Sequence, residues 1–109
     1  MQIALISDPE TNENIRLDFL HIKKTLIILR ALNHKLRQQI LKIIDERRKV
    51  TVTEIYIELR LEQSVASQHL AILRTAGLVT TSRDGKFIHY SINYKRIKEV
   101  NKLVENFVG

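Results

Sequence analysis

The chain contains no cysteine, only one proline and three glycines, and no long apolar run. Without a thiol it can form no disulfide, offer no thiolate to a metal ion and undergo no thiol-based redox sensing. It also has no glycine-rich phosphate loop, and its four histidines are scattered rather than set at metal-ligand spacing. The sequence therefore predicts neither a metal site nor a cofactor.

Membrane and export signals are missing as well. No stretch approaches the roughly 18 apolar residues that a membrane-spanning helix needs. The opening segment, residues 1–7, has neither a basic region nor an apolar core long enough for a signal peptide. We therefore expect a cytoplasmic protein without a membrane partner.

The charge is unbalanced towards the basic side. Eighteen Lys and Arg against 12 Asp and Glu give a net charge of +6. Such an excess favours a polyanionic partner, either nucleic acid or an acidic membrane surface, although it also serves solubility alone. A length of 109 residues with 44% hydrophobic residues fits one domain with a modest core, which dimer formation would stabilise further.

The chain divides into a short tail and one domain. Residues 1–12 hold Pro9 and several turn-forming residues, so we expect a flexible N-terminal tail. Residues 13–109 then form a single domain. Apolar side chains recur at helical spacing over residues 15–32, which predicts a long first helix within the segment 13–32.

Alternating helix and strand signals follow. Asn33 and Thr53 are typical N-caps, so we expect a second helix after Asn33 and a third from Thr53 to about residue 61. The β-branched segment Val50–Val52 predicts a small strand between them. A fourth helix begins at Ser64 and ends at Gly77, and Asn93 caps a last helix over residues 94–108.

Between the last two helices, Asp84-Gly85 marks a tight turn, and residues 78–92 around it alternate like a β-hairpin. A helix followed by a hairpin beside it is the layout of a winged helix-turn-helix. We therefore predict a mainly α fold with a small β-hairpin (α+β), with residues 62–77 as recognition helix and residues 78–92 as wing. Duplex DNA is the first partner to consider.

The fourth helix has one face suited to a DNA groove. At 100° per residue its polar or small side chains fall together: Ser64, Ser67, Gln68, Ala71 and Thr75. Gln68 can pair bidentately with adenine, and the two serines can contact bases or phosphates. Arg74 lies at the edge of this face, placed for a phosphate. The alternative is an ordinary solvated face, but the neighbouring hairpin favours the DNA-contacting interpretation.

At the hairpin tip, Arg83 and Lys86 flank the turn and are suited to a minor groove or its phosphates. The alternative is a charged turn that keeps the protein soluble. His69 falls on the core-facing side of the fourth helix, where we expect a hydrogen-bonded structural residue rather than a base reader.

The first and last helices offer apolar stripes beyond what one small core requires. The candidate contacts are Leu17, Leu20, Ile97, Val100, Val104 and Phe107. We expect these side chains to form a homodimer interface, since DNA readers of this size commonly work in pairs. The alternative is that the stripes cover only their own core.

Several of these segments resemble the ArsR/SmtB family of bacterial transcriptional regulators. The resemblance runs over about residues 31–93. It is carried by Ala31-Leu32, Arg37 and Ile40-Leu41, by Leu61–Leu70 with Leu73–Val79, and by the wing from Arg83 to Ile92. It implies a homodimeric winged-helix repressor of an imperfect inverted repeat in a promoter, with dimer contacts from the first and last helices. It also implies that Gln63, together with the serines and Gln68, faces the major groove.

Departures from the family concern the effector. Metal sensors of the family often carry a Cys-x-Cys pair where this chain has Thr51 and Thr53, and hydroxyls cannot replace thiolates for soft metals. Others use Asp and His on the last helix, and residues 93–109 contain neither. The sequence therefore predicts no metal sensing by either route, and the small-molecule effector stays unknown. Arg60 also stands where the family often has Gly.

Two competing functions can be compared with a DNA-binding regulator. A winged-helix protein-interaction module without sequence-specific DNA binding would expose an apolar patch rather than Ser, Gln and Arg. An enzyme would need a reacting group, and Ser67, His69 and Asp84 make a poor triad because the first two point in different directions on one helix. We therefore predict a DNA-binding transcriptional regulator that is not an enzyme.

Overall fold

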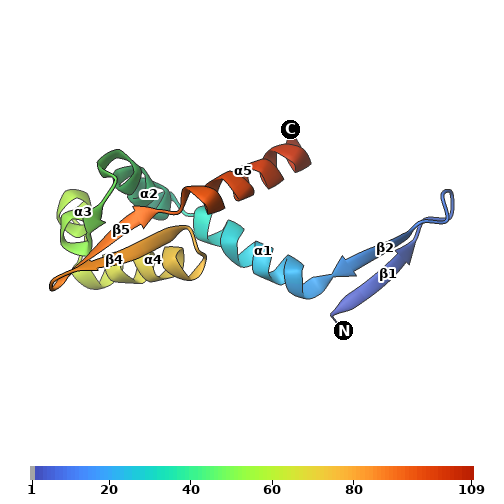
Figure 1. The fold of residues 1–109 in the computed structure, drawn as a ribbon, viewed down its shortest axis with the longest axis horizontal. Coiled ribbons are helices and arrows are strands. Elements are labelled where there is room, and N and C mark those ends of the chain that lie inside the picture. Colours follow the sequence, from blue (N-terminus) through green and yellow to red (C-terminus); the bar gives the residue numbers. More distant parts are fainter. Residues whose placement is uncertain (1) are drawn as a thin grey trace.

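A computed structural model describes residues 2–109 of the chain. The molecule is elongated, with principal extents of 58 × 29 × 24 Å. Helices and a small sheet gather at one end, α1 and α5 project from them, and a separate hairpin lies at the far end (Figure 1). The elements are β1 Ile3–Ser7, β2 Asn14–Asp18, α1 Phe19–Leu32, α2 Lys35–Arg47, β3 Val50–Thr51, α3 Val52–Leu59, α4 Gln63–Thr75, β4 Val79–Asp84, β5 Phe87–Ile92 and α5 Tyr94–Val108.

The winged helix-turn-helix prediction is confirmed at the level of architecture. Three helices, α2 to α4, pack with an antiparallel sheet whose strand order is β3-β5-β4. Val50 pairs with Tyr90, so the short strand before α3 closes the sheet on the side away from β4. The wing thereby lies beside α3 and α4, as a groove-binding unit requires.

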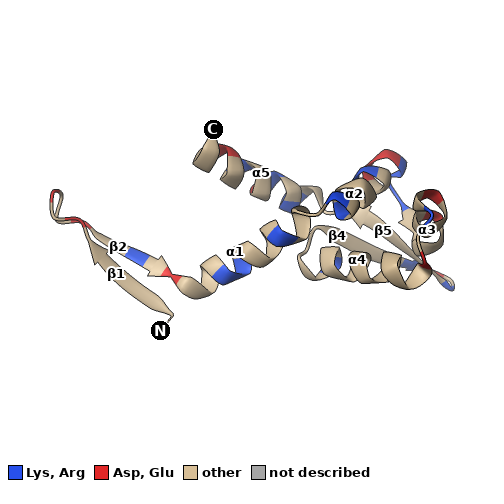
Figure 2. Cartoon of the chain, turned by 180° about the vertical axis from the view of Figure 1, so that it is seen from behind, with Lys and Arg blue, Asp and Glu red and all other residues tan. Residues whose placement is uncertain are grey.

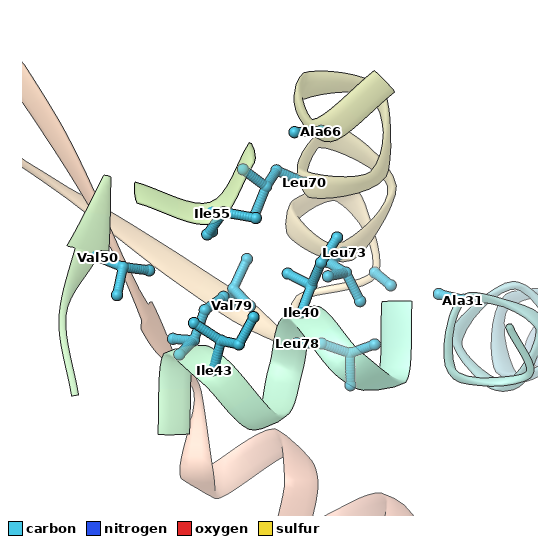
Figure 3. Close-up of a cluster of buried hydrophobic side chains, with 12 residues drawn as sticks. Ala31, Ile40, Ile43, Val50, Ile55, Ala66, Leu70, Leu73, Leu78 and Val79 are labelled. Carbon is cyan, nitrogen blue, oxygen red and sulfur yellow. The ribbon is translucent and has the colours of Figure 1, made fainter. Parts of the chain in front are cut away.

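The core of this unit is aliphatic, and four helices, α1 to α4, and the sheet contribute to it. Its buried members are Ala31, Ile40, Ile43, Ile44, Val50, Ile55, Ala66, Leu70, Leu73, Ala76, Leu78 and Val79 (Figure 3). The apolar stripes of α2 and α4 therefore face inward. Burying a Leu or Ile fully contributes roughly 1.5–3 kcal/mol, so these few side chains hold the helices on the sheet.

The predicted positions of two helix caps were wrong, one by one residue and the other by two. His34, not Asn33, caps α2, because its Nδ1 accepts a hydrogen bond from the Leu36 N–H at 3.2 Å. The Asn33 N–H instead closes α1 by donating to the Leu29 carbonyl at 2.9 Å. Thr51, not Thr53, caps α3 in a reciprocal capping box with Glu54, which satisfies two end groups at once. Asn93 caps α5 as predicted, since its Oδ1 accepts from the Arg96 N–H.

The predictions for the N-terminus were wrong. In place of a flexible tail over residues 1–12 and a helix from residue 15, the chain forms the antiparallel hairpin β1–β2. Helix α1 starts only at Phe19, because the Asp18 carboxylate accepts from the N–H groups of Leu20 and His21 and so ends the strand. Leu17 therefore lies on a strand rather than on the first helix. The division of the chain into domains stays a prediction.

No helix within residues 2–109 combines the length and the apolar character needed to cross a bilayer.

Candidate nucleic-acid interface

The turn between α3 and α4 sets the direction of the fourth helix. Arg60 ends α3 in the left-handed conformation (φ 54°, ψ 47°), and the Leu61 N–H donates back to the Tyr56 carbonyl at 2.9 Å. The chain then enters α4 at Gln63, one residue before the predicted start. At the other end Gly77 takes a positive φ of 74°, as expected for the residue after a helix end.

The predicted reading face of α4 is free of the protein core. All of its members are exposed: Ser64, Ser67, Gln68, Ala71 and Thr75. Gln63 and Arg74 are exposed beside them. In Figure 2, α4 shows far less charge than α2 or the wing. The helix therefore offers small, mostly neutral hydrogen-bonding side chains over which its backbone can approach a groove closely.

A single guanidinium fixes α4 against the end of α1. Arg37 donates from Nε to the Ala31 carbonyl at 2.7 Å and from Nη2 to the Arg30 carbonyl at 3.1 Å. Its Nη1 lies 3.2 Å from Nδ1 of His69 on α4. Arg37 thus joins α1, α2 and α4. Sequence reasoning quoted it only as part of a family motif, because contacts 6 and 32 residues away leave no spacing signal.

His69 has the structural role that the sequence predicts. Its burial lowers its pKa, and the charges of His34 and Arg37 lower it further. A neutral ring can accept the Arg37 hydrogen bond at Nδ1, whereas a protonated ring would place two cations together. The His34 ring, whose centroid lies 4.8 Å away, completes the contact between α2 and α4.

The wing turn differs by one residue from its prediction. Asp84 is still paired, with Phe87, so the turn consists of Gly85 and Lys86. Gly85 has a φ of 62°, which suits the first position of a two-residue hairpin turn.

Both predicted wing cations lie at the exposed tip, but each also contacts the tip itself. The Arg83 Nε donates to the Gly85 carbonyl at 3.2 Å. The Lys86 Nζ lies 5.6 Å from the centroid of the Phe87 ring. The two side chains therefore stiffen the turn while they keep positive charge at its end.

The residues considered for a triad are not assembled into one. Ser67 is on the exposed face of α4, His69 is bound to Arg37, and Asp84 belongs to the wing. Within residues 2–109 no group of three or more His, Asp or Glu side chains is arranged to hold a metal ion.

The predicted dimer residues fall into two groups. Ile97 packs against the core and Val100 is half-buried, so the first half of α5 does cover its own domain. Leu20, Val104 and Phe107 are exposed, Phe107 by 88%. An apolar groove of about 330 Å³ lies between α1 and the end of α5, lined by Thr25, Leu29, Leu103, Val104, Phe107 and Val108.

Comparison with known proteins identifies relatives over most of this length. Residues 34–81 match the sequence profile of a family described as "Bacterial regulatory protein, arsR family". An uncharacterized HTH-type transcriptional regulator of Methanocaldococcus jannaschii is 36% identical over 83 residues, which cover 76% of this chain and 93% of the relative. The transcriptional activator HlyU of Vibrio cholerae is 33% identical over 81 residues, 74% of each chain.

A solved structure agrees with the sequence matches. The crystal structure of the transcriptional repressor PagR of Bacillus anthracis superposes with a TM-score of 0.64 at 29% identity. The match covers 80% of this chain and 99% of that one.

Proposed function

Because the chain belongs to the arsR family of bacterial regulatory proteins and is a DNA-binding transcriptional regulator, we propose that it acts as a homodimeric repressor. It binds an imperfect inverted repeat in a promoter and blocks transcription by occupying it. The single observation that carries this proposal is the exposed, small and polar face of α4 beside a cationic wing tip.

Each proposed DNA-contacting residue has a distinct task. Gln68 pairs with an adenine edge, and Gln63, Ser64 and Ser67 contact neighbouring bases or phosphates in the major groove. Arg74, at the edge of the face, binds a phosphate. Arg83 and Lys86 hold the wing on the adjacent minor groove or its backbone. Phosphate neutralisation supplies most of the affinity, so binding falls steeply with salt.

Dimer formation brings two such faces onto one duplex. The exposed ends of α1 and α5 supply the contacts, including Leu20, Val104 and Phe107. A two-fold dimer reads two half-sites that are related by inversion and about one helical turn apart. An inverted repeat is therefore the operator that such a dimer would bind.

We propose further that regulation does not use the metal sites described for related sensors. The Thr51 hydroxyl accepts from the Glu54 N–H at 3.3 Å and lies 3.1 Å from the Glu54 carboxylate, so it serves as a helix cap. Its partner position, Thr53, is an exposed hydroxyl on α3.

Selection of bound duplexes from a random pool tests the proposal. We expect the enriched sequences to contain two inverted half-sites with centres about 10 base pairs apart. A pool that shows no enrichment, with equal binding to all duplexes, would support the protein-interaction alternative instead. Expression of a reporter gene from a promoter that carries the enriched site then distinguishes a repressor, which lowers expression, from an activator, which raises it.

A further inference from the structure

The hairpin β1–β2 has two different faces. Side chains directly opposite each other in an antiparallel pair point to the same side of the sheet. Ala4 pairs with Leu17, and Ile6 pairs with Ile15, so one face is wholly apolar. On the other face Ile3 pairs with Asp18, and Leu5 with Arg16, so it is mixed.

The apolar face is only partly covered by its own chain, where Ala4 and Leu17 are half-buried. Ile6 is 49% exposed and Ile15 is 43% exposed. Figures 1 and 2 view the chain from opposite sides, and in both the hairpin lies beyond the end of α1, away from the winged unit and from α5. An isolated two-stranded hairpin is marginal in water, so a partner is needed to hold this one.

The elongated shape of the whole chain also indicates a contact with another molecule. Its radius of gyration is 17.9 Å, against about 13 Å for a compact domain of this length. Its accessible surface is 8305 Å², roughly 2,000 Å² more than the approximately 6,200 Å² of a compact monomer of 12.7 kDa. Two chains that bury this excess would lose roughly 4,000 Å² together, within the range of obligate homodimers.

The charge of the hairpin segment indicates which partner covers its apolar face. Residues 1–18 carry four carboxylates and one arginine, a net charge of −3, so residues 19–109 carry +9. An acidic arm is repelled by DNA and by anionic lipid, but it is attracted to the basic remainder of another copy. That remainder exposes Leu103, Phe107 and Val108 on α5, beside Lys98 and Lys102.

We propose that the hairpin is an intermolecular arm: its Ala4, Ile6, Ile15 and Leu17 face binds a second copy of this chain, over the exposed apolar end of α5. The arm extends the α1 and α5 contacts, so this inference rests on the proposed homodimer.

Two paired variants of the full chain test the arm. In the face variant, Ile6→Thr and Ile15→Thr are combined; in the control, Ile3→Thr and Leu5→Thr are combined. Each pair replaces two exposed aliphatic residues with a β-favouring polar one, on opposite faces. By sedimentation equilibrium, we expect the face variant to raise the dimer dissociation constant at least tenfold and the control to change it less than threefold.

Helical circular dichroism verifies that both variants keep the winged unit, since the hairpin contributes no residue to its core. Amide hydrogen exchange on the unmodified chain gives an independent readout. We expect protection of residues 3–18 above the dimer dissociation constant and its loss below that concentration.

The outcomes separate the arm from the proposed function. Equal dimer affinity for both variants and the unmodified chain would overturn the arm and leave the α1–α5 dimer on DNA intact. Equal weakening by both variants would also overturn it, because the face would not matter. A chain that stays monomeric both free and on its selected duplex would overturn the arm and the proposed dimeric repressor together.

Discussion

The winged unit and the two ends of the chain are stabilised in different ways. Among residues 2–109, every buried side chain lies between Ala31 and Val79. The segments 2–30 and 93–109 contain no buried residue, although they hold many of the large aliphatic side chains. The winged unit thus buries its own core within one chain, whereas its flanks leave much of their apolar surface exposed.

The largest expected effect comes from a core leucine. Leu70→Ala should lower the free energy of unfolding by about 2–5 kcal/mol, because it leaves a cavity in a fully buried site. Leu103→Ala removes the same atoms from an exposed position on α5. Urea denaturation at several protein concentrations should show a concentration-independent loss for the first and a loss through weaker dimers for the second. If both variants lost stability with the same dependence on protein concentration, the winged unit and the flanks would not differ in how they are stabilised.

The next effect concerns the junction between the two regions. Arg37→Met should cost roughly 1.5–3 kcal/mol of stability, since charge-assisted hydrogen bonds to two carbonyls and to His69 are lost. Operator affinity should fall as well, because α4 loses its tie to α1. Lys42→Met, at an exposed position of the same helix, is the control. Full affinity in the Arg37 variant would show that α4 is oriented by the core alone.

Base reading should be a property of the unit's outer face. Gln68→Ala should cost about 1–3 kcal/mol on the selected operator and almost nothing on random duplex. Titrations of labelled duplexes at fixed salt measure both. Thr80→Ala, an exposed polar position on β4, is a suitable control. The same loss on both duplexes would mean that Gln68 does not read sequence.

Wing contacts should differ from base contacts in their dependence on salt. Lys86→Ala should weaken operator and random duplex alike, by up to about 1 kcal/mol. The slope of log affinity against log salt should fall by roughly one for the lost phosphate contact. A loss confined to the operator would instead assign Lys86 to base recognition.

The smallest effect is a pH dependence that belongs to the unit rather than to the flanks. The lowered pKa of His69 means that the unfolded chain takes up the proton more readily than the folded one. The stabilising contribution is therefore complete above about pH 6.5 and declines as the pH falls below that value. Denaturation at pH 7.5 and pH 5.5 should show a smaller decline for His69→Gln than for the unmodified chain.

Sequence reasoning succeeds where local signals and burial agree. The apolar side chains of α2 and α4 recur with the helical period, and the wing strands alternate with a period of two. Gly77 marks the end of α4. Small errors arise where neighbouring residues compete for one role, as Asn33 and His34 do at the start of α2. The reading face of α4 was therefore predictable as an exposed surface, and its contacts with DNA stay a prediction.

The hairpin was missed for a physical reason. Its loop around Pro9 has the composition of a disordered segment, and its strands are only five residues each. Residues 15–17 also fit the helical spacing of α1, so the period alone could not decide between strand and helix. If the strands are held by a second copy of the chain, no local pattern records that partner.

Hydroxyl-radical footprinting of the dimer on its selected duplex tests the central claim most directly. The account predicts two protected patches, related by inversion and centred about 34 Å apart along the helix axis. A single protected patch at saturating protein, or two patches separated by a distance that is not a multiple of the helical repeat, would contradict it.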